Sequence, residues 1–255
     1  STYGAFEESM SNVKAISGAT AEEFDKLTAK AKEEGATTKF TAKDSADAFG
    51  YMAMAGWKTE DMLQGIDGIM SLAAASNEDL ATTSDIVTDA LTAFGLKASD
   101  SGHFADVLAQ ASANANTNVG MMGESFKYVA PVAGALKYSV EDVSLALGLM
   151  ANASVKGSMA GTSLKTSLAN MAAPTDKMEA AMDKYGISLT KRNGEMKTMH
   201  EVLDNLRSSL GGLSETEQTA AASTIFGKEA MAGMLAIINA SEDDYNKLTL
   251  SLIHI

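Results

Sequence analysis

The chain has no cysteine, only two prolines, one tryptophan and three histidines among its 255 residues. Without cysteine it can form no disulfide, no thiolate zinc site and no cysteine nucleophile. The three histidines are far apart in the sequence, which disfavours a histidine-based metal site. Proline breaks helices, whereas alanine and methionine favour them, so two prolines beside 43 alanines and 16 methionines predict a helical protein.

Basic residues are also scarce. The chain has 20 Lys and Arg against 33 Asp and Glu, a formal net charge of −13. Contacts to phosphates need clustered Lys and Arg, so this balance disfavours a general nucleic-acid-binding protein. No apolar run approaches the roughly 18 residues of a membrane span, and the first residues resemble no secretory leader. The 45% hydrophobic content is enough for a buried core.

Helix starts and ends can be recognised from capping residues. A Ser or Thr followed three residues later by an acidic residue caps a helix start, and glycine often follows a helix end. This spacing predicts starts at Thr20, Thr41, Ser139 and Ser214, and Thr59 is predicted as a further start because Glu60 and Asp61 follow it directly. Ends are predicted at Gly35, Gly95 and Gly186, and the last full helix is expected at residues 228–239.

Two segments interrupt the helical pattern. Pro131 lies inside an apolar segment at residues 122–136, which predicts either two short helices or one kinked helix. Residues 187–190 alternate between apolar and polar and are followed by Asn193-Gly194, so a small β-hairpin is predicted near residues 187–197. The predicted fold is therefore mainly α, a multi-helix bundle with one hairpin.

A weak internal similarity suggests a duplicated helical unit. The pattern Phe-x-Tyr-x-Ala at residues 49–53 recurs at residues 126–130, and Glu60-Asp61 recurs as Glu141-Asp142. The offset changes from 77 to 81 residues. Stacked repeats share a core, but chance similarity between Ala-rich helices explains the pattern equally well.

Three segments are expected along the chain. Residues 1–36 are predicted to be the end of a longer helical or coiled-coil region, and residues 37–249 to be a helical core. Residues 250–255 (LSLIHI) match what a transposon-type sequencing adapter encodes in one frame, so we expect them to be extraneous. His254 would then have no functional meaning.

The motifs that could support catalysis are weak. Ser11 and Lys14 have the spacing of some serine acyl enzymes, but no accompanying motif, so an exposed helix face is the better interpretation. Residues 157–163 (GSMAGTS) lack the Lys-Ser/Thr ending of a phosphate loop, and we expect Gly157 and Gly161 to let two helices approach closely. Asp85 and Asp89 are one turn apart, as expected for the solvated face of an amphipathic helix.

The remaining candidates are also better explained by structure. His103 and His200 have no second ligand at metal-binding spacing, so each is expected to be an ordinary polar or half-buried residue. The glycosylation sequons at Asn152 and Asn239 are too short to be informative. Most methionines are expected to pack in the core; the ones considered are Met121, Met122, Met150, Met159 and Met171. No catalytic, cofactor-binding or metal-binding residue is predicted.

An ordered series of segments resembles the conserved core of phage tail tape measure proteins. No single segment is diagnostic, but the set follows the family's order over about residues 15–239. The main segments are residues 85–96 (DIVTDALTAFGL), 104–109 (FADVLA), 126–133 (FKYVAPVA), 147–153 (LGLMANA), 156–162 (KGSMAGT) and 225–230 (IFGKEA).

This resemblance implies a structural component of a phage or prophage tail. Family proteins are long and helical, lie within the tail tube, set its length and leave the tail during DNA ejection. The implied partners are the tail tube protein, tail tip or baseplate proteins and tail assembly chaperones, with several copies side by side in the virion. Synthesis would take place in the bacterial host cytoplasm. The resemblance transfers no catalytic residues and no cofactor.

Two alternatives belong to other classes. A lytic enzyme acting on the cell wall would need a grouped Glu and catalytic partner, or a metal, and the sequence groups no such residues. A generic intracellular helical adaptor would lack tail genes in its genomic neighbourhood. For the tail hypothesis, an acidic surface would repel DNA passing through the tube.

Overall fold

The computed structural model describes residues 1–253 and 255. These residues are 77% helical and form fourteen α-helices and one short 3-10 helix, with no named strand. The predicted mainly α bundle is therefore confirmed. The chain divides into two compact units, Ser1–Ala109 and Gln110–Ile255.

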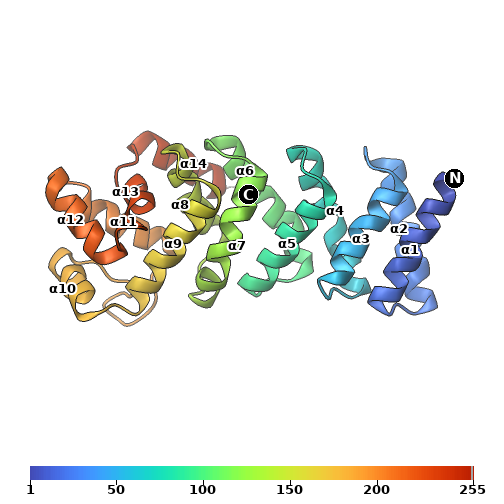
Figure 1. Ribbon diagram of the computed structural model, residues 1–255, viewed down its shortest axis with the longest axis horizontal. Helices are drawn as coiled ribbons and strands as arrows, with labels where there is room; N and C mark the ends of the chain where they lie inside the picture. The colour runs from blue at the N-terminus through green and yellow to red at the C-terminus, as the bar shows by residue number, and fades with distance from the viewer. Residues whose placement is uncertain (254) are drawn as a thin grey trace. The chain divides into compact units, whose positions relative to one another are not determined.

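The first unit is built from five helices, the 3-10 helix and the beginning of α6, which continues across the unit boundary (Figure 1). Helix α3 contacts α1, α2, α4 and α5, so it is the central element of this unit. The elements are α1 (Thr2–Ser17), α2 (Ala21–Thr37), α3 (Ala42–Met54), α4 (Thr59–Ser76), α5 (Leu80–Phe94), η1 (Ala98–Asp100) and α6 (Ser101–Asn114).

The second unit contains eight complete helices. Helix α7 lies along α9, and α13 contacts α8, α9, α11 and α12 (Figure 1). The helices are α7 (Val119–Ala135), α8 (Val140–Asn152), α9 (Gly157–Ala172), α10 (Asp176–Tyr185), α11 (Met199–Leu210), α12 (Glu215–Phe226), α13 (Met231–Ile238) and α14 (Glu242–Ile253).

Capping residues fix most helix ends as predicted. The Thr20 and Thr41 hydroxyls accept from the third following amide, and the acidic residue there reaches back to the cap, as in a capping box. Ser139 caps α8 through its hydroxyl, which accepts from Asp142 N at 3.1 Å, while the Asp142 carboxylate accepts from His200 N. Gly95 and Gly186 follow α5 and α10 with φ of 67°, which confirms both predicted ends.

Two predicted boundaries are wrong. Helix α2 continues past Gly35 to Thr37, because this glycine serves close packing: a Cβ there would lie 2.6 Å from the Ala42 backbone nitrogen. Thr59 is the first helical residue of α4 and is buried, while the cap is Lys58, whose backbone N–H donates to Asp61 at 3.2 Å.

The region around Pro131 forms one helix, α7, which settles the choice between one helix and two. The predicted hairpin at residues 187–197 is wrong. Thr190 and Met196 make a single antiparallel bridge around the Asn193-Gly194 turn. The apolar–polar alternation does bury Ile187, but the segment is too short to form a ladder of paired strands. The Lys197 ammonium instead donates to the Ser188 carbonyl at 2.9 Å.

The expected last helix begins later than predicted, at Met231, and a further helix, α14, follows it. Tyr245, Leu248 and Leu252 of α14 are buried. That residues 250–255 are extraneous stays a prediction. Sequencing of the gene from the source DNA would test whether these codons belong to it.

The turns that join α3 to α4 and α7 to α8 lie in the two segments that resemble each other in sequence. Trp57 N donates to the Met52 carbonyl, and 81 residues later Tyr138 N donates to the Ala133 carbonyl, both at 3.0 Å. Gly56 with φ of 90° corresponds to Lys137 with φ of 63°. The two turns therefore have the same hydrogen bonds. The same pattern also ends α5, α8 and α10, where Leu96, Val155 and Ile187 donate to the fifth preceding carbonyl, so it is a common helix end and duplication of a helical unit stays a prediction.

Candidate functional site

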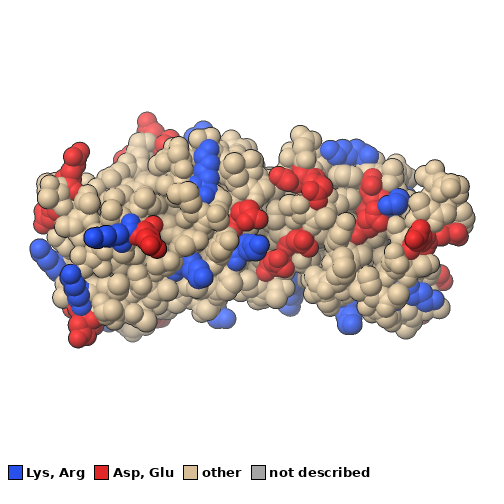
Figure 2. Space-filling view, in the orientation of Figure 1, with Lys and Arg blue, Asp and Glu red and all other residues tan. Residues whose placement is uncertain are grey.

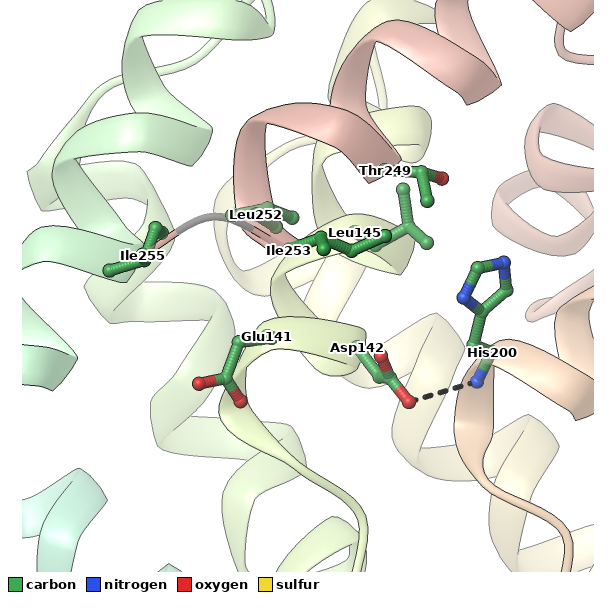
Figure 3. A pocket seen from close by; sticks show the side chains of 8 residues that line it. All are labelled: Glu141, Asp142, Leu145, His200, Thr249, Leu252, Ile253 and Ile255. Atoms are coloured by element: carbon green, nitrogen blue, oxygen red, sulfur yellow. Dashed lines mark hydrogen bonds between the residues drawn. The ribbon is translucent and has the colours of Figure 1, made fainter.

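The second unit contains a hollow of about 220 Å³ beside the start of α8. Figure 3 shows Glu141 and Asp142 on one side and His200 on another, with residues of α14 closing the top. The Asp142 carboxylate accepts a hydrogen bond of 3.1 Å from the His200 backbone nitrogen, so it caps the start of α11. The imidazole ring points away from this carboxylate (Figure 3).

His200 instead faces the second turn of its own helix and α14. Its Nε2 lies 3.7 Å from the Asp204 carboxylate, and its ring meets the Tyr245 ring edge to face at 5.7 Å. The Tyr245 hydroxyl donates to Asp204, and burial first and this carboxylate second raise the pKa of Tyr245. The Arg207 guanidinium lies over the Tyr245 ring, 4.3 Å from its centroid.

Arg207 connects three segments of the second unit. Its Nη1 donates to the carbonyls of Ile237 at 2.8 Å and Ala240 at 2.9 Å, and its Nη2 pairs with Glu242 at 3.2 Å. These contacts add a charged donor to two carbonyls at and after the end of α13, where the Ile237 carbonyl also accepts from Ala240 N at 3.4 Å, and they join α11 to the start of α14. The charged and aromatic residues here therefore connect α8, α11, α13 and α14.

The first unit has a second polar cluster, formed by Lys30 and Glu34 of α2 and Asp67 of α4. The Lys30 ammonium lies 3.3 Å from each carboxylate. Glu34 is only 4% exposed. Its burial, followed by the nearby Asp67, raises the pKa of Glu34 to about 7, against the opposing effect of Lys30. This cluster was not predicted, although Glu34 follows the buried Leu27 and Ala31 on one face of α2.

Comparison with known proteins decides the family. A model of the phage-related minor tail protein family matches residues 28–227. The chain belongs to this family. It is 38% identical over 249 residues to the tape measure protein of Pneumococcus phage Dp-1, covering 98% of this chain and 22% of that protein. It is 26% identical over 249 residues to the probable tape measure protein of Escherichia phage P2, covering 96% and 31%.

The chain therefore spans between about a fifth and a third of the length of these two relatives. No solved structure matches it. Among the described residues of this minor tail family member, no helix is long and apolar enough to cross a membrane. Within the same residues, no group of three or more His, Asp or Glu side chains could hold a metal ion.

The weak catalytic candidates lie on exposed helix faces. Ser11 and Lys14 are exposed on α1, and the Lys14 ammonium lies over the Phe24 ring, 5.2 Å from its centroid. Asp85 and Asp89 are exposed on α5, as predicted for a solvated face. Partial burial and then the negative charge of Asp89 raise the pKa of Asp85.

The other polar candidates have structural positions. His103 is exposed at the start of α6, His200 is half-buried, and His254 lies outside the described residues. Both sequon asparagines use their side chains within the fold of this family member. Asn152 accepts from the Asn116 backbone nitrogen at 2.9 Å, and Asn239 exchanges hydrogen bonds with Gln218.

The two glycines of the rejected phosphate loop have different roles. A Cβ at Gly161 would lie 2.4 Å from the Ser125 carbonyl oxygen, so this glycine permits the close approach of α9 to α7, as predicted. Gly157 has open space around it and is needed for its φ of 58°, so the close-approach prediction is wrong there.

The methionine prediction is only partly correct. Met122, Met150 and Met171 are buried in the second unit. Met121 is 40% exposed and Met159 is 67% exposed, because each lies on the outward face of its helix. The apolar pattern alone could not separate these two groups, since methionine is tolerated on both faces.

Proposed function

We propose that this segment is a folded structural module of a phage tail tape measure protein, located in the virion tail and acting in tail assembly and tube-length determination. The observation that carries the proposal is the alignment of almost the whole chain with two proteins named as tape measure proteins. The proposed partners are the tail tube protein, tail tip or baseplate proteins and tail assembly chaperones, with several copies in one tail. A role in DNA ejection and synthesis in the host cytoplasm belong to the same proposal.

We further propose that the module is not an enzyme. Its polar clusters support this, because Asp142, Asp204 and Arg207 are each engaged with backbone groups or a neighbouring ring across helices. A zymogram with bacterial peptidoglycan tests the cell-wall alternative. A clear lytic band from the purified chain would contradict the proposal.

The acidic charge of the chain is concentrated in one unit. Residues 1–109 contain 8 Lys and Arg against 18 Asp and Glu, a net charge of −10, and residues 110–255 contain 12 against 15, a net charge of −3. Figure 2 shows basic side chains dispersed among acidic ones on the face drawn, without a continuous basic stripe. Such surfaces favour repulsion of DNA, and tight DNA association at low salt would contradict this part of the proposal.

The deciding experiment is an in-frame deletion of residues 37–249 in the phage gene, followed by electron microscopy of tails. A single continuous helix would shorten the tube by about 1.5 Å per deleted residue, roughly 320 Å in total. The helices here fold back on one another, so we expect tails to be absent or shortened by far less. Normal yield and normal length would contradict a role in assembly.

A further inference from the structure

Glu34 is the one Asp, Glu, Lys or Arg residue that is buried in the described part of the chain. It continues the apolar face of α2 after Leu27 and Ala31, at a position where an uncharged side chain would be expected. A buried carboxylate is costly unless it is paired or neutral. The groups around Glu34 therefore determine which protonation state the fold prefers.

One cation is shared between two carboxylates in this cluster. Lys30 lies 3.3 Å from Glu34 and 3.3 Å from Asp67, and it is 3.7 Å from the exposed Glu33. With one proton on Glu34, the trio of Lys30, Glu34 and Asp67 has no net charge. Without that proton it has a net charge of −1, in a place where Glu34 has little contact with water. The proton is thus required for charge balance.

Every charged group that faces the cluster can be named. Helix α2 supplies Lys30 and Glu33, and α4 supplies Asp67. Lys39, in the connection to α3, lines the adjoining hollow and points its ammonium to the Ala74 carbonyl at 3.4 Å. The charged side chains of α3 do not line this hollow, and its Lys43 is paired with Asp47 at 2.7 Å.

The cluster also connects two helices and has access to solvent. Asp67 is 68% exposed, while Glu34 is buried at the other end of the trio. A hollow of about 470 Å³ lies between α2 and α4, and Phe40 and Met70 are among its lining residues. Protons can therefore reach Glu34 from this side without unfolding of the unit.

We propose that Lys30, Glu34 and Asp67 form a proton-operated latch between α2 and α4, closed while the two carboxyls hold one proton and loosened when it leaves. Loss of the proton places an unbalanced negative charge beside Asp67, and separation of α2 from α4 relieves this charge by admitting water. The latch is a conformational device of the first unit and is independent of the role in the tail.

The direction of the pH effect follows from linkage. The pKa of Glu34 is near 4.5 when the carboxyl is exposed to water and about 7 when it is buried in the closed latch. The buried carboxyl therefore stabilises the closed latch fully below pH 4.5, and this stabilisation is lost as pH rises through 7. Between pH 6 and pH 8, the equilibrium constant for opening should therefore increase about tenfold.

The test is hydrogen exchange of the α2 amides in the full chain at pH 6 and pH 8, corrected for the intrinsic effect of pH on exchange. The wild-type chain should show the tenfold increase in opening. Glu34→Gln should reduce this increase to less than about twofold and keep α2 as protected at pH 8 as the wild type is at pH 6. Glu33→Gln is the matched control, because it removes an exposed carboxylate near the same lysine and should leave the tenfold increase unchanged.

Asp67→Asn keeps the proposal testable if Glu34→Gln fails to fold. Asp67 is mostly exposed, and its loss leaves Lys30 balanced by an ionised Glu34, so α2 should remain protected at pH 8. A wild-type chain whose α2 opening changes less than twofold between the two pH values would overturn the latch. So would a tenfold change that persists in Glu34→Gln or in Asp67→Asn.

Discussion

Close contact between helix backbones gives the first unit its sharpest prediction. Gly68 of α4 lies against the junction of η1 and α6. A Cβ at this position would be 2.7 Å from the Gly102 nitrogen and 2.7 Å from the Ser101 carbonyl carbon. These are backbone atoms, which cannot rotate away as the end of a side chain can. Gly68→Ala must therefore push α4 away from this junction.

The expected magnitude is the difference between two effects. Overpacking of a close contact costs about 1–3 kcal/mol, whereas alanine in a helix interior is about 1 kcal/mol more favourable than glycine. Since the atoms in contact are backbone atoms, we expect a cost near the upper end of the first range, so Gly68→Ala should destabilise the first unit by up to about 2 kcal/mol. Gly50 is the matched control because it also lies inside a helix, α3, but a Cβ there would meet no atom within 4 Å. Gly50→Ala should stabilise the unit by about 0.5–1 kcal/mol.

The single tryptophan supplies the assay. Trp57 is 9% exposed, and its ring packs against Gly65 of α4, so its fluorescence reports unfolding of the first unit. In urea titrations, Gly50→Ala should unfold at the highest urea concentration, the wild type at an intermediate one and Gly68→Ala at the lowest. Equal stabilisation by both substitutions would show that α4 does not approach the junction as closely as described, and would refute the reasoning.

Two further predictions concern the second unit. Lys137 has a φ of 63°, a left-handed conformation that strains a residue with a side chain and that Gly56 adopts in the turn after α3. Lys137→Gly should therefore raise the free energy of unfolding by about 0.5–1 kcal/mol, measured by thermal melts followed by circular dichroism. An unchanged free energy of unfolding would contradict strain at Lys137. Arg207→Ala removes the charged donor to the Ala240 carbonyl and one of the donors to the Ile237 carbonyl, so it should destabilise the unit by about 2–3 kcal/mol and increase the exchange of α14 amides. Unchanged exchange would contradict its linking role.

Much of the fold could be predicted because local hydrogen bonding determines the helix ends. A Thr hydroxyl that accepts from the third amide satisfies a donor that no helical carbonyl can reach, and this requirement is visible in sequence at Thr20 and Thr41. The same signal was available for the missed helix α14, since the Ser241 hydroxyl accepts from Asp244 N at 3.1 Å.

The errors come from residues whose role depends on distant neighbours. Gly35 has the appearance of a helix end, but it is glycine because Ala42 approaches it after the chain has turned back. The hairpin pattern at residues 187–197 is too short to form a ladder when Lys197 and Asn205 take up nearby polar groups. The pattern of apolar and polar residues within one segment does not show which distant residues will contact it.

Contacts between distant residues also determine the roles of the two polar clusters, one in each unit. Glu34 is conspicuous only when α4 brings Asp67 to Lys30, 37 residues away in sequence, so the sequence alone indicates an ordinary charged helix face. Asp142, His200 and Asp204 have the residue types of an acid–base site, yet one carboxylate caps a helix and the other accepts from Tyr245. In this member of the phage-related minor tail protein family, the polar residues of the second cluster connect helices. Glu34 is the one buried carboxylate among the described residues, so we expect a change in pH to act there first.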